Sequence, residues 1–210
     1  MSVPTAVAFD LGGVVIDWDP RHLYRKVFED PAEMERFLST VCTPAWNDAF
    51  DRGHPFREGV ERLVREHPEL AGPIRAYLER WDEMLAGPIP GTVEVLLELR
   101  RRGVRLFALS NWSTETFPHA RMRYEVLGWF EGILLSGEVG VTKPAPGIYR
   151  AFLERFHLRA RDCAFVDDRP ANVETARRLG FPSVVFRSPM QLREELRGLG
   201  LLEGARAAER

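Results

Sequence analysis

Five short apolar runs, each bounded by turn-forming or charged residues, constrain the fold of this chain more than any other feature. Continuous apolar runs of this length are typical of β-strands that are covered on both faces of a sheet. The runs are AVAFD (6–10), VRLFALSN (104–111), GILLS (132–136), CAFVDD (163–168) and PSVVF (182–186). Helical patterns separate most of them, so the order predicts an α/β fold with a Rossmann-like, doubly wound parallel sheet.

Amphipathic segments between these runs predict the connecting helices. In TVEVLLELRRRG (92–103) we expect Thr92 to cap the start of a helix and Gly103 to follow its end. The segments APGIYRAFLERFHL (145–158) and PANVETARRLG (170–180) also carry helical apolar spacing. Strand and helix thus alternate, and ligands are expected at the carboxyl ends of the strands.

Residues 17–87 separate the first run from the second and lack comparable strand signals. Prolines break this segment into several helical stretches, and its end, AGPIPG (86–91), has a composition suited to a hinge or a stiff return to the sheet. We therefore predict a core domain of residues 1–16 and 88–210 with an inserted helical cap subdomain of residues 17–87. Inserted directly after the first strand, the cap would hang over that strand's carboxyl end and could act as a lid.

Polar side chains gather where the predicted strands end. A carboxylate there can attack phosphorus, a hydroxyl and an amide can hold phosphate oxygens, and a lysine can neutralise developing negative charge. Two adjacent carboxylates repel unless a cation or proton lies between them, and hard oxygen ligands suit Mg²⁺. This set predicts metal-assisted phosphoryl transfer, and its members are Asp10, Ser110, Asn111, Lys143, Asp167 and Asp168.

Four motifs occur in order along the chain: FDLGGVV (9–15), LSN (109–111), KP (143–144) and FVDD (165–168). In this order the chain resembles the haloacid dehalogenase superfamily over nearly its whole length. The resemblance implies a hydrolase with a small helical cap, a phosphorylated small molecule as substrate and Mg²⁺ as cofactor. Within the superfamily, the chain is most similar to phosphatases with a DLG first motif, such as glucose-1-phosphate phosphatases.

The superfamily's residue roles carry over by position. The resemblance implies Asp10 as the covalent nucleophile, Lys143 as the lysine that stabilises charge and contacts phosphate, and a phosphate-contacting pair of Ser110 and Asn111. It also implies a metal site of Asp10, the backbone carbonyl of Gly12 and Asp168 as the main acidic ligand, with Asp167 supporting the metal or its waters.

Gly12 departs from the pattern, because many phosphatases of the superfamily carry a second aspartate at this position as their general acid and base. Loss of a positioned proton-transfer group costs about 10²- to 10⁴-fold in rate. We predict a phosphatase whose leaving group departs easily, as in an anomeric sugar phosphate, or whose proton is moved by water or another side chain.

Two alternatives stay open. A 2-haloacid dehalogenase explains Gly12, since halide leaves without a proton, but those enzymes need no metal and carry neutral residues in place of Asp167 and Asp168. A module that captures phosphorylated ligands without turnover is the other alternative, and the full set of nucleophile, lysine and acidic pair argues against it.

Several residues of the insertion are candidates for the pocket. Asp17 is a tempting replacement acid, although we favour a hinge role for it, and Asp19 and His54 are weaker candidates. Trp112 follows the phosphate-contacting pair directly, so we expect it either to wall the substrate pocket or to pack against the next helix. Arg52 is a further candidate for substrate contact.

Composition bounds the remaining expectations. A formal net charge of -2, with 45% hydrophobic and 29% charged residues, shows no bias toward nucleic acid or membrane. No basic flank precedes a long apolar stretch, which predicts a cytoplasmic protein. Cys42 and Cys163 match no metal spacing, so we expect free thiols, and Trp46 is expected in the core. No pattern predicts an oligomeric state.

Overall fold

The computed structural model describes residues 3–203 and contains a five-stranded parallel sheet in the order β5-β4-β1-β6-β7. The five predicted apolar runs all form strands of this sheet, and the predicted Rossmann-like α/β fold is confirmed. The strands are β1 (Ala6–Phe9), β4 (Arg105–Ser110), β5 (Gly132–Leu135), β6 (Cys163–Asp167) and β7 (Ser183–Val185).

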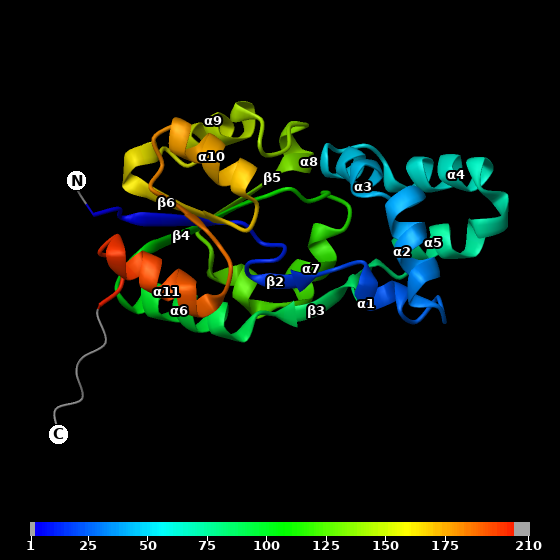
Figure 1. The fold of residues 1–210 in the computed structure, drawn as a ribbon. Helices are drawn as coiled ribbons and strands as arrows, with labels where there is room; N and C mark the ends of the chain where they lie inside the picture. The colour runs from blue at the N-terminus through cyan, green and yellow to red at the C-terminus, as the bar shows by residue number, and fades with distance from the viewer. Residues whose placement is uncertain (1–2, 204–210) are drawn as a thin grey trace, which may run out of the picture.

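Helices cover both faces of the sheet (Figure 1). α6 (Pro90–Arg101) and α11 (Pro189–Gly198) lie on one face, and α9 (Pro146–Arg155) and α10 (Pro170–Arg178) lie on the other. The strand residues alternate accordingly, because successive side chains of a strand point to opposite faces. Val7 and Phe9 join the cluster of α6 and α11, and Ala6 and Ala8 join the cluster of α9 and α10.

Shorter elements complete the core domain. They are α7 (Phe117–Arg123), the 3₁₀ turns η3 (Glu125–Trp129) and η4 (Ala160–Asp162), and α8 (Ser136–Val139), which directly follows β5. Among the described residues, no helix is long and apolar enough to cross a membrane.

The predicted cap at Thr92 is wrong. α6 begins at Pro90, and its N-terminal flanking residue is Ile89, which offers no side-chain oxygen. Thr92 lies inside the first turn, fully buried, and its hydroxyl finds no partner among residues 3–203. Proline at the first helical position explains the start, because its fixed φ suits a helix and its missing N–H costs nothing there.

A two-stranded antiparallel ribbon of β2 (Ile16–Trp18) and β3 (Leu85–Pro88) connects the core to the inserted segment. The sequence did not predict these strands. The predicted domain boundaries, 16/17 and 87/88, fall inside this ribbon. The elements between the two strands are helical, as expected: α1 (Arg21–Tyr24), α2 (Pro31–Thr40), α3 (Pro44–Asp51), α4 (Phe56–Glu66), η1 (Pro68–Leu70), α5 (Ala71–Glu79) and η2 (Trp81–Met84).

Aromatic side chains form the centre of this helical cap. Trp46 packs edge-on against Phe50 and Tyr77, with ring centroids 4.6 and 5.0 Å away, which confirms its predicted place in the core. Phe50 stacks on Phe56 at 4.0 Å. The interior also contains the thiol of Cys42, and Cys42 and Cys163 are both buried and free, as predicted.

The cap touches the core at a second place besides the ribbon. The end of α3 packs against α8, and the two helices lie side by side in Figure 1. At Gly53, just past α3, a Cβ atom would lie 3.0 Å from the carbonyl oxygen of Gly137, so glycine permits this close approach. The cap is therefore held over the carboxyl ends of the strands from two sides.

Candidate active site

Asp10 stands one residue past β1, where its backbone N–H bonds to Val166 of β6 at 2.8 Å. One carboxylate oxygen, Oδ1, accepts from the Leu11 N–H at 2.7 Å and the Ser110 hydroxyl at 2.9 Å, and it lies 2.9 Å from Lys143 Nζ. No donor among the described residues reaches the other oxygen, Oδ2. Burial raises the pKa of Asp10, against the opposing charge of Lys143. The carboxylate is thus held by one oxygen and left open at the other.

Lys143 is a buried cation with three oxygen partners. Its Nζ donates to the Leu109 carbonyl at 2.8 Å and to Asp167 Oδ2 at 2.7 Å, in addition to its contact with Asp10. Burial disfavours the charged form, but the two carboxylates outweigh it and the pKa of Lys143 is raised. Lys143 therefore carries its charge at the end of the sheet.

Asn111 uses its side chain on the backbone of Lys143. The Asn111 carbonyl oxygen accepts from the Lys143 N–H at 2.8 Å, and its amide donates to the Lys143 carbonyl at 3.0 Å. One amide N–H remains for a phosphate oxygen. Asn111 therefore positions Lys143, and its contact with phosphate stays a prediction.

The two adjacent aspartates differ sharply in their surroundings. Asp167 is fully buried, and its carboxylate accepts from Lys143, from the Arg169 N–H at 2.8 Å and from Asn172 at 2.9 and 3.0 Å. Asp168 is exposed over the residue as a whole, but its carboxyl group is partly shielded from water. This desolvation, followed by the charge of Asp167, raises the pKa of Asp168. Asp168 is thus open to a ligand, whereas Asp167 is occupied by protein donors.

Gly13 makes room for Asp168. Its φ is +75°, and a Cβ atom there would lie 2.9 Å from Asp168 Oδ2, closer than real contacts allow. The neighbouring carbonyl oxygen of Gly12 accepts no hydrogen bond within residues 3–203. Glycine at position 13 therefore permits the close approach of the Asp168 carboxylate.

The donor set fits a magnesium ion. Carboxylate oxygens of Asp10, Asp167 and Asp168 lie within 4.8 Å of one another. Magnesium prefers hard oxygen ligands, and a cation among three carboxylates relieves their mutual repulsion. Burial is the main cause of the raised pKa values of Asp10 and Asp168, and the charges of the neighbouring carboxylates add to it.

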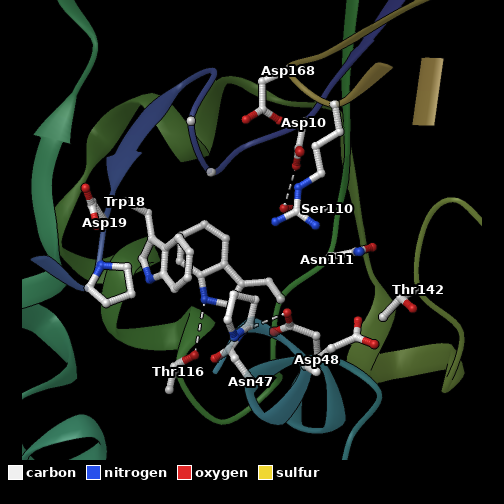
Figure 2. Close-up of a pocket in the computed structure, with 18 of the residues that line it drawn as sticks. Asp10, Trp18, Asp19, Asn47, Asp48, Ser110, Asn111, Thr116, Thr142 and Asp168 are labelled. Carbon is white, nitrogen blue, oxygen red and sulfur yellow. Dashed lines mark hydrogen bonds between the residues drawn. The ribbon is translucent and has the colours of Figure 1, made fainter. Parts of the chain in front are cut away.

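A cavity of about 840 Å³ lies between this edge of the sheet and the cap. Figure 2 shows Asn47 and Asp48 of α3 on the side opposite Asp10, Ser110 and Asp168. Both predicted pocket residues, Trp112 and Arg52, line it, as do the aromatic side chains of Trp18, Phe56, Tyr77 and Trp81.

The lining residues named from the sequence are held in different ways. Trp112 walls the cavity and is also packed, since its indole donates to Thr116 at 3.1 Å and its ring lies 5.6 Å from that of Trp81. Arg52 forms an ion pair with Asp48. His54 is exposed and lies outside this cavity.

The insertion contributes polar residues that sequence reasoning missed, namely Asn47, Asp48 and Asp51. All three line the cavity. Their spacing in PAWNDAFD, opposite the apolar Trp46 and Phe50, is the signal of a polar face on α3. That spacing alone does not say whether the polar face meets solvent or a ligand.

Residues 4–180 match the family described as haloacid dehalogenase-like hydrolase. The chain is 24% identical to a sesquiterpene phosphatase of Aspergillus oryzae, over 92% of this chain and 95% of that protein. It is 33% identical to a phosphoserine phosphatase of Thermus thermophilus, over 72% of this chain and 62% of that protein.

Two solved structures illustrate the likeness of fold. A HAD family enzyme of Bacteroides thetaiotaomicron, solved as a magnesium complex, has a TM-score of 0.70 at 20% identity and covers 89% of this chain and 94% of its own. A dehalogenase with an intermediate complex has a TM-score of 0.66 at 19% identity and covers 89% of this chain and 86% of its own.

Proposed function

This chain belongs to the haloacid dehalogenase-like hydrolase family, and from that premise we propose that it is a Mg²⁺-dependent phosphatase of a small phosphate monoester, such as a sugar phosphate. The observation that carries the proposal is the divided environment of the Asp10 carboxylate. Three donors hold Oδ1, no donor among the described residues reaches Oδ2, and Asp10 lines the cavity. A carboxylate fixed in this way is oriented for attack by a single oxygen.

The residues around Asp10 have separate tasks in this reaction. Oδ2 of Asp10 bonds to phosphorus as the bond from phosphorus to the ester oxygen breaks. Lys143, the Ser110 hydroxyl and the remaining N–H of Asn111 stabilise the phosphoryl oxygens, and water then cleaves the aspartyl-phosphate. The cap limits access of bulk water, which strengthens these charge interactions.

Asp10, Asp168 and the Gly12 carbonyl would hold the magnesium ion. When bound, the ion supplies positive charge that neutralises the phosphoryl oxygens beside the nucleophile. We assign Asp167 to positioning, because protein donors occupy both of its oxygens and one of those donors is Lys143. Its predicted support of the metal would act through water.

A panel of phosphate monoesters with and without magnesium tests the proposal. We expect phosphate release that needs Mg²⁺ and that is abolished in the Asp10→Asn variant, which keeps the size of the side chain. Absence of release from every ester in the panel would count against the phosphatase. Ligand binding without turnover would then support the module that only captures phosphorylated ligands.

Halide displacement is the second candidate, because Gly12 offers no proton donor and halide needs none. A solved dehalogenase shares the fold of this chain, which is compatible with this candidate. The acidic pair argues for the phosphatase, since dehalogenation has no need of a cation at Asp168. Halide release from a 2-haloacid that persists in the presence of a chelator would favour this candidate.

A further inference from the structure

Gly12 leaves the proposed reaction without a group to protonate the departing oxygen. We infer that Asp51, the last residue of α3, is the general acid and base of this hydrolase. The inference rests on the proposed phosphatase function, because it supplies the proton of that reaction. It places a catalytic group on the cap rather than two residues past the nucleophile.

The backbone of Asp51 is anchored to the core. The hydroxyl of Ser136, at the start of α8, donates to the Asp51 carbonyl. The same hydroxyl accepts from the Trp112 N–H at 3.0 Å. Trp112 follows Ser110 and Asn111, so one fully buried hydroxyl joins Asp51 to the loop that is expected to hold the phosphate.

The carboxyl group of Asp51 is oriented by the cap interior. Asn47 donates to Asp51 Oδ2 at 3.0 Å, and Asn47 in turn accepts from the hydroxyl of Tyr77 at 2.9 Å. Tyr77 is buried, so its hydroxyl is a fixed donor to Asn47, which in turn donates to Asp51. Within residues 3–203 no donor reaches Asp51 Oδ1, so one oxygen is held and the other is available in the cavity.

Asp51 also differs from the other acids that the cap contributes to the cavity. Among the described residues, it is the one of these carboxylates that has no arginine, lysine or histidine nitrogen within ion-pair distance. Asp19 and Glu35 pair with Arg21 at 3.3 and 2.6 Å, and Asp48 pairs with Arg52. Asp17 contacts the imidazole of His22 at 3.0 Å. A carboxylate paired with a cation stays ionised near neutral pH and has no proton to donate, because the cation favours its charged form.

The electrostatic surroundings support a proton-transfer role. Burial raises the pKa of Asp51 to about 7, and the charge of Asp48 adds to this effect while Arg169 opposes it. Asp10 and Lys143 act in smaller measure from the core, Tyr77 faces Asp51 from α5, and Arg52 is paired with Asp48 on its own helix. A pKa near the working pH suits a group that must first give and then accept a proton.

The reaction balances with this assignment. Protonated Asp51 gives its proton to the ester oxygen as the bond from phosphorus to that oxygen breaks and the bond to Asp10 Oδ2 forms. The resulting Asp51 carboxylate accepts a proton from the water that attacks the aspartyl-phosphate. Phosphate leaves, and Asp10 and protonated Asp51 are restored.

The test compares two substrates that differ in how much their leaving group needs a proton. Phenyl phosphate releases a more basic oxygen than p-nitrophenyl phosphate does. In Asp51→Asn we expect kcat/KM for phenyl phosphate to fall by about 10²- to 10⁴-fold, with a much smaller fall for p-nitrophenyl phosphate. Asparagine keeps the acceptor for Asn47. The exposed Asp30→Asn, at the start of α2 and outside the lining of the cavity, is the matched control and is expected to stay close to wild type on both substrates, because asparagine can still accept from the Ala32 N–H.

The pH profile gives a second readout. Because the acid must start protonated, wild-type kcat/KM for phenyl phosphate is expected to fall as the pH rises through about 7. This limb should be absent in Asp51→Asn. An equal loss on both substrates, an unchanged pH profile or full activity in Asp51→Asn would overturn the inference. Asp10→Asn separates the two proposals, since it must abolish turnover of both esters whatever Asp51 does.

Two further variants guard against a simple folding defect. A Cβ at Gly12 would lie 3.9 Å from its nearest neighbour, Trp18 Cβ, so Gly12→Asp is sterically allowed. In the Asp51→Asn background, Gly12→Asp should restore hydrolysis of phenyl phosphate. Asn47→Ala, which removes the orienting donor, should give the same substrate-selective loss as Asp51→Asn. Failure of both results would refute the role of Asp51.

Discussion

Asp51→Asn is expected to stabilise the protein at neutral and higher pH and to have little effect in acid. Burial raises the pKa of Asp51 from its ordinary 3.8 to about 7. The unfolded chain therefore releases this proton at lower pH than the folded protein does. Stability contributed by the protonated group is fully present below about pH 3.8 and is lost as the pH rises through about 7. Asparagine resembles the neutral carboxyl group and does not suffer this loss.

The size of the effect follows from the two pKa values. Raising a pKa from 3.8 to about 7 corresponds to ~4 kcal/mol at 1.36 kcal/mol per unit, and we expect about half of this because solvent reaches part of the side chain. For a protein of this size, about 2 kcal/mol shifts Tm by roughly 4–8 °C. The gain of Asp51→Asn over wild type should therefore grow between about pH 4 and pH 7 and then level off.

Thermal denaturation across this pH range, with a chelator present, measures the effect. Glu35→Gln is the matched control with the opposite sign. The hydrogen bond from Arg21 lowers the pKa of Glu35, so its contribution is present above the ordinary pKa and is lost in acid. Glu35→Gln should therefore lose stability at neutral pH. A Tm difference between wild type and Asp51→Asn that stays constant over the range would refute the environment assigned to Asp51.

Three other variants probe the same edge of the sheet. Gly13→Ala should weaken magnesium activation, measured as a higher Mg²⁺ concentration for half-maximal rate, because its Cβ would meet Asp168 at 2.9 Å in a backbone conformation that costs about 1–2 kcal/mol. Lys143→Met should abolish turnover and lower stability by about 3–5 kcal/mol in denaturant unfolding, because it leaves buried carboxylates unpaired. Ser136→Ala should lower kcat/KM for phenyl phosphate more than for p-nitrophenyl phosphate, because it releases Asp51 from the core, and a loss of about 1–3 kcal/mol in stability should accompany it.

The sheet could be predicted because its strands are buried on both faces. Each strand is then a continuous apolar run, and the position of Asp10 at the end of the first run places it at the carboxyl edge. The ribbon of β2 and β3 escaped prediction because it is short, partly exposed and contains Pro88, so it shows neither a continuous run nor a clean alternation. Thr92 was assigned as a cap from its residue type, whereas Pro90 determines where α6 begins.

The core half of the candidate site was predictable for a topological reason. Parallel strands bring their carboxyl ends to one edge, so Asp10, Ser110 and Asp168 had to lie near one another once the strand assignments were right. The hydrogen-bond partners of each side chain at this edge were not predictable. Both polar atoms of the Asn111 side chain form hydrogen bonds with the backbone of Lys143. These bonds depend on the path of the loop after α8, which the sequence does not reveal.

The cap half could not be predicted, because its chemistry depends on tertiary contacts. An aspartate at the end of a helix is ordinarily exposed and charged, and nothing in its sequence neighbourhood signals otherwise. Asp51 becomes distinctive only when α3 packs on α8, the Asn47 amide engages one oxygen and the core places charges nearby. The contact with Asn47 is local to α3, whereas α8 and the core charges come from other parts of the chain.

The position of the acid has a consequence for the reaction. A second aspartate at position 12 would belong to the same rigid loop as Asp10 and would be in place whether or not the cap covers the cavity. Asp51 is in place only while its carbonyl is held by Ser136 and α3 rests on the core. A leaving group that needs a proton can then depart only from the covered cavity, so the same contact that limits bulk water also completes the proton-transfer machinery. For a good leaving group the contact matters less, which is why the ratio of the two phenyl esters, rather than the rate with either one, is the quantity that reports on Asp51.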